Sequence, residues 1–263
     1  MASTPWTAES VREAISLVRW YHSFEVFPGV ITPGITTVDP GGRLDMFGLP
    51  ADLHGTRALD IGTWDGPVAF ELERRGATVT ALDIQDPNLT GFNTAKAIRG
   101  SHVAYVQGDV AGMPAKLHGT YDLVIYCGVF YHLKDPIRAF ESIALLMNEQ
   151  SLMCFEGETL LHYAETLEGT PDQSLPLAAI SASRVPFAFC YPGAYKKASN
   201  WFIPNLACVE SWLQAAGMTL VSHRFYSLPD SKPFPTQRIS GTARKAGTPL
   251  EEHPVVGRTI FSG

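Results

Sequence analysis

The sequence predicts an α/β fold: a doubly wound, mostly parallel sheet with a C-terminal antiparallel hairpin and an N-terminal helical cap. The first observation is a series of short apolar runs without polar alternation, separated by amphipathic segments. Buried parallel strands covered by helices on both faces have this pattern. The second observation is a pair of strand-like segments, residues 218–227 and 237–246, with only a turn-rich stretch between them. That spacing suits an antiparallel hairpin better than a crossover connection.

Each expected element has a local sequence signal. The clearest helix covers residues 135–147, because Asp135 can cap it and Pro136 suits its first turn. A second helix is expected at about residues 204–216, ended by Gly217. The buried strands are expected in five apolar runs, at residues 58–62, 78–84, 103–109, 121–128 and 151–158.

Changes in composition and hydrophobic pattern along the chain predict three regions. Ser10 and Glu13 fit a capping box at the start of an N-terminal helix, and a loop rich in Gly and Pro follows from Pro28 to Gly42. A Pro-containing irregular stretch late in the chain reads as an insertion. The predicted regions are a helical cap and loop at 1–55, the sheet domain at 56–250 with an insertion at 159–200, and a tail at 251–263.

Composition excludes several classes of protein. The 263 residues are 45% hydrophobic and 17% charged, which is typical of a globular chain. The formal net charge of −6, with no run of basic residues, disfavours non-specific nucleic-acid binding. The first ten residues, MASTPWTAES, have neither a basic start nor an apolar core and do not predict a signal peptide, no apolar run approaches roughly 20 residues, and the four cysteines form no C-x-x-C. We therefore expect a cytoplasmic protein with no membrane association; the oligomeric state is left open.

The segment DIGTWDG, residues 60–66, follows the first predicted strand and predicts a nucleotide site. Gly62 and Gly66 let the backbone come close to a ligand at the carboxyl edge of the sheet. Asp83 ends the second strand 23 residues after Asp60, where an acid can accept hydrogen bonds from ribose hydroxyls. Asp109 ends the third strand, where a carboxylate can accept from an adenine amino group. Three acids at three strand ends favour a ligand site over a simple turn.

The same turn argues against a dinucleotide. A pyrophosphate site reads G-x-G-x-x-G, whereas this turn reads G-T-W-D-G. Trp64 and Asp65 would crowd and repel the phosphates. S-adenosylmethionine (SAM) has no phosphate, a cationic sulfonium and an amino acid end, so that Asp60 near its amine is favourable. The turn therefore predicts SAM as the cofactor.

These residues also carry a family resemblance, which covers about residues 50–246. DIGTWDG resembles the D-x-G-x-G-x-G motif of class I SAM-dependent methyltransferases, with Trp64 in place of the central glycine. The resemblance implies a Rossmann-like seven-stranded sheet whose last strand is antiparallel. More narrowly, GVFYHLKDP (128–136), residues 195–218 and WYHSFEVFPGVITPG (20–34) look like the branch that contains the tRNA wobble-uridine carboxymethyltransferases.

The sequence departs from that narrower branch where its cofactor is recognised. The tRNA enzymes use carboxy-SAM, whose extra carboxylate is held by basic residues. Here the corresponding stretch, residues 227–237, is short, Arg238 reads as the start of the last strand, and no matching lysine is recognisable. Ordinary SAM with a small-molecule acceptor is the main prediction. Carboxy-SAM with tRNA, or a SAM-binding protein without catalysis, are the alternatives.

The cofactor-binding residues are predicted in the turn and at the strand ends. Gly108 and Val110 flank the third acid, and the resemblance implies that Tyr131 touches the cofactor. The full predicted set is Asp60, Gly62, Thr63, Trp64, Gly66, Asp83, Ile84, Gly108, Asp109, Val110, Cys127 and Tyr131.

Catalytic and substrate-binding residues are predicted around the same edge. Tyr131 and His132 follow the fourth strand and Glu156 lies near the end of the fifth, although capping or packing explains His132 equally well and a solvated strand end explains Glu156. Tyr21 and His22 close the first helix as a lid or as packing. The predicted substrate-binding residues are Tyr21, His22, Tyr195 and Trp201. No metal is predicted, because the eight histidines include no H-x-H or H-E-x-x-H.

Overall fold

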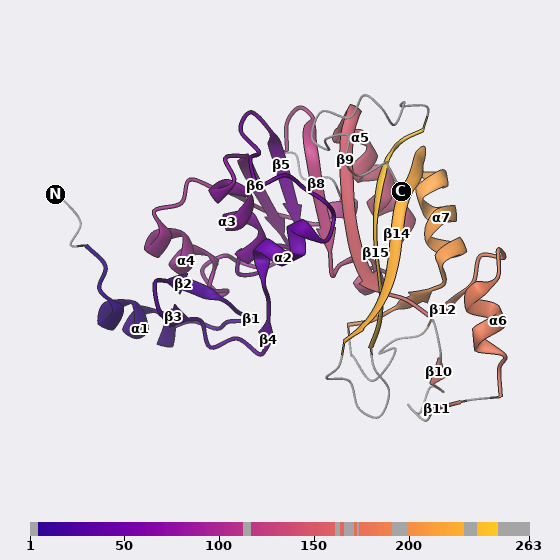
Figure 1. Cartoon of the computed structure of the whole chain (residues 1–263), viewed down its shortest axis with the longest axis horizontal. Helices are drawn as coiled ribbons and strands as arrows, with labels where there is room; N and C mark the ends of the chain where they lie inside the picture. The colour runs from indigo at the N-terminus through magenta and orange to yellow at the C-terminus, as the bar shows by residue number, and fades with distance from the viewer. Residues whose placement is uncertain are drawn as a thin grey trace. The chain divides into compact units, whose positions relative to one another are not determined.

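The computed structural model describes residues 5–112, 117–160, 164–165, 171–172, 174–190, 199–228 and 236–246. The helices are α1 (Ala8–Ser16), α2 (Pro40–Asp45), α3 (Pro67–Arg74), α4 (Phe92–Arg99), α5 (Pro136–Leu145), α6 (Leu177–Ala182) and α7 (Leu206–Ala215), with 3₁₀ turns η1 (Val110–Gly112) and η2 (Phe130–His132) (Figure 1). The long strands are β5 (Arg57–Ile61), β6 (Thr78–Asp83), β7 (Ala104–Gln107), β8 (Tyr121–Cys127), β9 (Met147–Glu158), β14 (Met218–Leu228) and β15 (Thr236–Lys245). Short strand pairs are formed by β1 (His22–Ser23), β2 (Glu25–Phe27), β3 (Val30–Ile31), β4 (Thr36–Thr37), β10 (Ala164–Glu165), β11 (Pro171–Asp172), β12 (Ala188–Cys190) and β13 (Phe202–Pro204).

The long strands form one seven-stranded sheet in the order β14-β15-β9-β8-β5-β6-β7. β5, β6 and β7 pair in parallel, whereas β15 is antiparallel to both β9 and β14. The strand order reverses at β5, with β6 and β7 on one side and β8 and β9 on the other. This confirms the predicted doubly wound, mostly parallel sheet with a C-terminal antiparallel hairpin.

The elements lie close to their predicted positions, with one correction. Each of the five apolar runs forms a strand, mostly buried except in β7, where only Val106 is buried, and Asp135 caps α5 by accepting from Arg138 N at 3.1 Å. The helix ends at Leu145 rather than at 147, because Met147 is already the first residue of β9. β9 therefore starts four residues before its apolar run, in a polar stretch that gave no strand signal.

The N-terminal region differs from its prediction in two ways. The capping box of α1 is made by Thr7 and Ser10, not by Ser10 and Glu13, since the hydroxyl of Ser10 reaches back to Thr7 N at 3.0 Å. The helix begins correspondingly earlier. The expected loop from Pro28 to Gly42 contains β3, β4 and the first turn of α2. Short strands there replace a structureless connection.

The chain forms two compact units that divide within β8, between Leu123 and Val124. The domain boundaries predicted at residues 55 and 250 stay predictions, and the predicted tail at 251–263 lies outside the described residues. Within those residues, no helix combines the length and the apolar character needed to cross a bilayer.

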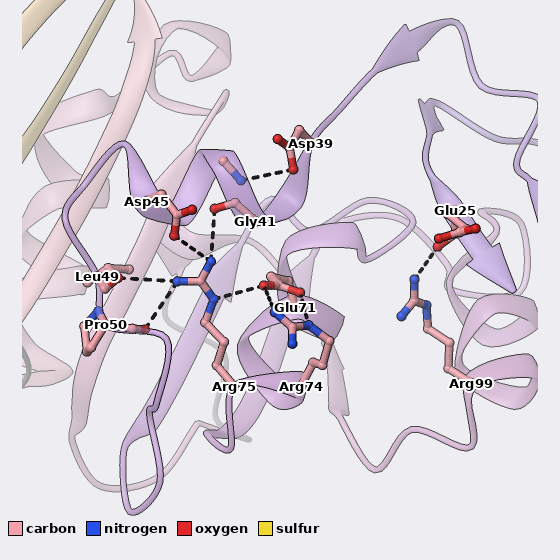
Figure 2. A network of polar contacts seen from close by, with 11 residues as sticks. Glu25, Asp39, Gly41, Asp45, Leu49, Pro50, Glu71, Arg74, Arg75 and Arg99 are labelled. Atoms are coloured by element: carbon pink, nitrogen blue, oxygen red, sulfur yellow. Dashed lines mark hydrogen bonds and ion pairs between the residues drawn. The ribbon is translucent and has the colours of Figure 1, made fainter. Parts of the chain in front are cut away.

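A buried arginine of the first unit, Arg75, forms the centre of a network of polar contacts (Figure 2). The Arg75 side chain donates from Nε to Glu71 at 2.9 Å and from Nη2 to Asp45 at 2.8 Å and to Gly41 O at 3.1 Å. Its Nη1 donates to the carbonyls of Leu49 and Pro50 at 3.4 and 3.3 Å. These bonds connect α2 and the segment before β5 to α3, the helix that follows the glycine turn.

In the second unit, the described part of the predicted insertion at 159–200 is held by a small core of its own. Leu160, Leu177 and Ile203 are buried together. Asn205 caps α7 by accepting from Cys208 N at 2.9 Å, and its amide donates to two carbonyls of the insertion at 3.0 Å each. The insertion is therefore folded onto the start of α7 by both apolar and polar contacts.

Candidate functional site

The turn between β5 and α3 has the backbone form that its glycines predict. Gly62 and Gly66 have φ of 77° and 89°, a region that glycine adopts without strain. A Cβ on Gly66 would lie 2.6 Å from the Phe70 ring and 2.8 Å from the Phe92 ring. Gly66 is thus required both by its backbone and by packing, and it starts α3 with Pro67 in the first turn.

Trp64 occupies a strained position at the tip of this turn. Its φ of 50° makes it a positive-φ non-glycine residue, which is uncommon for a bulky side chain. Trp64 N donates to Asp83 Oδ2 at 2.9 Å, and the hydroxyl of Thr90 donates to Trp64 O at 3.1 Å. The indole also packs against the Tyr21 ring, with 5.2 Å between ring centroids. Contacts on both sides of the peptide unit hold the strained conformation in place.

Asp83 ends β6 and links two loops at the carboxyl edge. One carboxylate oxygen accepts from Trp64 N and the other from Gln85 N at 3.0 Å. The side chain is 8% exposed, and this burial raises the pKa of Asp83 while the backbone N–H groups oppose the shift. Ile84, the next residue, is 64% exposed and offers an apolar surface beside the carboxylate.

Three buried polar atoms of this turn have no hydrogen-bond partner in the described part of the chain: Asp60 Oδ2, Thr63 Oγ1 and Trp64 Nε1. Buried polar atoms are normally paired, so that such a group marks a place for a ligand or water. Burial raises the pKa of Asp60 to about 6. The turn therefore offers an acceptor with a carboxylate charge and a separate N–H donor.

The end of β7 supplies the third predicted acid. Gly108 N donates to Asp83 O at 2.8 Å, so the hydrogen bonding between β6 and β7 continues one residue beyond the last registered pair, Asp83 and Gln107. The exposed Asp109 side chain accepts from Ala111 N at 2.9 Å, and Val110 behind it is buried. β5, β6 and β7 are parallel, so Asp60, Asp83 and Asp109, two residues beyond the last residue of β7, follow the same edge of the sheet.

Sequence reasoning missed what Asp65 does. Its carboxylate is fully buried, and Oδ2 accepts from the backbone N–H groups of both Tyr21 and His22 at 2.8 Å. Oδ1 makes a short hydrogen bond to His22 Nδ1. Asp65 is therefore bonded to the N-terminal segment.

The lid prediction for Tyr21 and His22 needs one correction. These residues do not close the first helix, because α1 ends at Ser16 and His22 begins β1. They reach the glycine turn through Asp65 and through the ring contact with Trp64. Their role in substrate binding stays a prediction.

In the second unit, Tyr131 lies in η2, directly after β8. Its hydroxyl accepts from Arg238 Nη1 at 3.1 Å, and the guanidinium carbon lies 5.1 Å from the ring centroid. Burial raises the pKa of Tyr131 above its ordinary value, although Arg238 opposes the shift. Tyr131 is therefore a neutral phenol at physiological pH.

Glu156, predicted as a catalytic residue, is the main partner of that arginine. Its two oxygens accept from Arg238 Nε at 2.5 Å and Nη2 at 2.7 Å, and Tyr226 donates to Oε1 at 2.8 Å. Burial lowers the pKa of Arg238, but Glu156 and its neighbours raise it overall. A carboxylate held in this way orients Arg238, and its direct catalytic role stays a prediction.

A second buried acid, Glu158, borders the same arginine. Its Oε1 lies 3.5 Å from Arg238 Nη1, and Asn200 Nδ2 donates to Oε2 at 2.8 Å. Asn200 is fully buried, and its Oδ1 atom has no hydrogen-bond partner among the described residues. Glu158, like Glu156, stands out in the sequence as an acid at the end of the fifth strand, whereas Arg238 and Asn200 gave no signal beyond strand or loop position, because their partners are distant in the chain.

The remaining predicted residues have structural contacts. His132 Nδ1 donates to Ser199 O at 3.1 Å, which fits the alternative that His132 has a packing role. Trp201 N donates to Tyr131 O at 2.7 Å, and the centroid of the Trp201 ring lies 4.6 Å from Lys134 Nζ. Cys127 is partly buried at the end of β8. The predicted substrate residue Tyr195 lies outside the described part of the chain.

Comparison with known proteins places the fold. Residues 59–155 match the family model for a methyltransferase domain. The N-terminal domain of EvdMO1 with S-adenosylhomocysteine (SAH) bound superposes with a TM-score of 0.59 at 19% identity, covering 93% of this chain and 100% of that domain. A SAM-dependent methyltransferase from Mesorhizobium loti gives 0.55 at 17% identity, with 78% and 96% covered. The chain has the SAM-dependent methyltransferase fold.

Sequence similarity to curated methyltransferases is limited in extent. The ubiquinone biosynthesis O-methyltransferase of Vibrio parahaemolyticus is 32% identical over 95 residues, which cover 36% of this chain and 40% of that enzyme. The chain thus matches less than half the length of this relative. The narrower resemblance to tRNA wobble-uridine carboxymethyltransferases stays a prediction.

Proposed function

We propose that this chain binds SAM at the carboxyl ends of β5, β6 and β7 and transfers its methyl group to a small-molecule acceptor. The main support is that three buried polar atoms of the glycine turn, Asp60 Oδ2, Thr63 Oγ1 and Trp64 Nε1, have no hydrogen-bond partner among the described residues. The methyltransferase-domain match over residues 59–155 and the SAH-bound structural neighbour support the same conclusion. The residues present fit an adenosyl amino acid.

Each part of the cofactor has a matching group on this chain. Asp83 has carboxylate lone pairs left after two backbone bonds, so it can accept from the ribose hydroxyls. Exposed Ile84 offers an apolar face for the adenine ring, and Asp109 can accept from its amino group. Asp60 can accept from the α-amine. Trp64, at the central glycine position, takes the space that a pyrophosphate would need.

Bound SAM supplies a methyl group on a sulfonium, an electrophile that reacts by in-line displacement. The main task of the protein is then to hold the acceptor in line with that carbon, which can supply most of the rate enhancement. With its raised pKa, Tyr131 keeps its proton and acts as a hydrogen-bonding group rather than as a base. Arg238 and Glu156 fix the position of its hydroxyl.

A small-molecule acceptor is the first choice, in agreement with the relatives named as ubiquinone biosynthesis O-methyltransferases. One observation favours carboxy-SAM as a second candidate, with tRNA as the acceptor: Arg238 donates to the hydroxyl of Tyr131, so a cation lies beside that side chain. Glu156 and Glu158 already balance this charge, however, and an added carboxylate would have to compete with them. Ordinary SAM therefore fits better.

The cytoplasm is the proposed compartment. Within the described residues no disulfide joins the cysteines, and Cys154 and Cys208 are buried in apolar surroundings. A reducing environment is consistent with this state of the thiols.

The proposal is tested by calorimetric titration of SAH into Asp83→Ala. Loss of charge-assisted hydrogen bonds to the ribose should weaken binding by about 1–3 kcal/mol. Asp86→Ala is the matched control, because Asp86 lies three residues further along the loop and its carboxylate accepts only from Asn88 in the contacts seen. Equal affinities for wild type and Asp83→Ala in the folded state would refute the ribose assignment.

Transfer is tested separately from binding. Purified protein is incubated with isotopically labelled SAM and fractions of a small-molecule extract, and both SAH formation and label in the acceptor are followed. Methylated product supports the enzyme. SAM bound without turnover in any fraction, including tRNA, would favour the non-catalytic alternative.

A further inference from the structure

Three unpaired atoms of the glycine turn specify the charge pattern of the ligand group that enters it. Asp60 Oδ2 is a buried acceptor, and Trp64 Nε1 is a buried donor that has no acceptor capacity. Thr63 Oγ1, between them in sequence, can donate or accept. A ligand that satisfies both Asp60 and Trp64 must therefore present a donor, preferably cationic, and an acceptor, preferably anionic.

An α-amino acid end has this pair of charges on one carbon atom. Its ammonium can donate to the Asp60 carboxylate, and its carboxylate can accept from an indole N–H. A neutral sugar or an adenine ring supplies donors and acceptors without the charges, and a phosphate supplies only acceptors. The atoms of this turn thus favour a zwitterion.

Surrounding contacts hold Trp64 in its strained conformation. A bulky residue at positive φ persists only when its surroundings fix it, and strain of this kind is concentrated at ligand clamps. Here Asp83 and Thr90 bond the two sides of the peptide unit, and the Tyr21 ring packs on the indole. The other tryptophans near the N-terminus differ: Trp6 Nε1 donates to Ala97 O at 3.1 Å and Trp20 Nε1 to Ile15 O at 2.8 Å.

We infer that the indole N–H of Trp64 binds the α-carboxylate of the cofactor and makes this site selective for adenosyl ligands that keep it. This inference rests on the proposed SAM site and deepens it. In place of the glycine of the family motif, the chain has a side-chain donor. Asp60, at the end of β5, binds the α-ammonium, so its contribution to affinity does not depend on whether the ligand has the carboxylate.

The experiment is a calorimetric comparison of two ligands on four proteins. The ligands are SAH and S-adenosyl-3-thiopropylamine, which keeps the amine and lacks the carboxylate. The proteins are wild type, Trp64→Phe, Asp60→Asn and Trp6→Phe. Phenylalanine keeps an aromatic ring that can pack on Tyr21, and it removes the five-membered ring of the indole together with its N–H.

A hydrogen bond to a charged group predicts that Trp64→Phe weakens SAH binding by about tenfold to a hundredfold. Binding of S-adenosyl-3-thiopropylamine should change by less than about twofold. Asp60→Asn should weaken both ligands, because both carry the amine, and Trp6→Phe should weaken neither. This crossed pattern separates a carboxylate contact from a general disturbance of the turn.

Two results would overturn this inference without affecting the proposed SAM site. In the first, Trp64→Phe binds SAH as tightly as wild type does. In the second, Trp64→Phe weakens both ligands equally, while Asp60→Asn and Trp6→Phe behave as expected. Circular dichroism and unfolding curves identify a variant that fails to fold, in which case Trp64→His, which retains a ring N–H, must restore selectivity for SAH. Wild type that binds neither ligand would refute the proposed SAM site itself.

Discussion

Replacement of Asp65 tests how the N-terminal segment is attached to the glycine turn. The buried carboxylate accepts three N–H groups, from Tyr21 N, His22 N and His22 Nδ1. Asp65→Ala removes all three acceptor contacts and leaves two backbone N–H groups without their partner. Asp65→Asn keeps one oxygen, which can still accept from both backbone N–H groups.

The expected magnitudes differ between these variants. Each hydrogen bond to a charged group contributes roughly 1.5–3 kcal/mol, but release of the segment returns about 1–2 kcal/mol of conformational entropy per residue. We therefore expect Asp65→Ala to cost about 3–5 kcal/mol, the usual range for breaking a buried charged contact. Asp65→Asn loses the charge assistance and the oxygen that contacts His22 Nδ1 but keeps the acceptor of both backbone N–H groups, so that it should cost about 1–2 kcal/mol.

Amide hydrogen exchange measures this attachment directly. In Asp65→Ala, exchange at Tyr21 and His22 should accelerate by about a hundredfold or more, with a smaller effect in Asp65→Asn. Asp52→Ala is the matched control: Asp52 also accepts from a backbone N–H and a His Nδ1, both of His54, but that pair is about four-fifths exposed and should leave stability close to wild type. Unchanged exchange at Tyr21 and His22 in Asp65→Ala would refute the attachment.

Three other outcomes are expected from denaturant unfolding. Arg75→Met should destabilise the chain by about 3–5 kcal/mol, since it removes the five hydrogen bonds that the buried Arg75 side chain donates; a loss below about 1 kcal/mol would contradict the network of Figure 2. Burial raises the pKa of Asp60 to about 6, so the protonated carboxyl stabilises the fold fully below about pH 4, and this stabilisation is lost as the pH rises through 6. The free energy of unfolding of Asp60→Asn should therefore rise by about 3 kcal/mol relative to that of wild type between pH 4 and 7. Plots of unfolding free energy against pH that stay parallel for the two proteins would exclude this effect. Glu156→Gln should cost about 3 kcal/mol by leaving Arg238 with a weaker partner, and adding Arg238→Met should recover part of that loss; a double variant worse than the single one would argue against the pair.

The sheet could be predicted from the sequence because its signals are local. A buried parallel strand is a short apolar run, and residues 121–128 show this over their whole length. Where the strand signal was weak, the prediction failed: β9 begins at Met147 and includes the polar residues 148–150, which have no apolar run. The start of α1 was misplaced because Thr7 and Ser10 offer a capping box that competes with the one expected.

The candidate site was predictable only in part. Strand-end acids such as Asp60 and Asp83 are visible from spacing, since the edge of a parallel sheet collects them. The partners of Asp65 lie 43 and 44 residues away, and Arg238 and Glu156 are 82 residues apart. Such pairs depend on tertiary structure, and a single sequence holds no local signal for them.

Native mass spectrometry of the protein with equal concentrations of SAM and NAD tests the central claim most directly. The account predicts a one-to-one complex with SAM that Asp83→Ala weakens, and no complex with NAD, because Trp64 takes the place of the phosphate-binding glycine. A retained dinucleotide, or no complex with SAM, would contradict it.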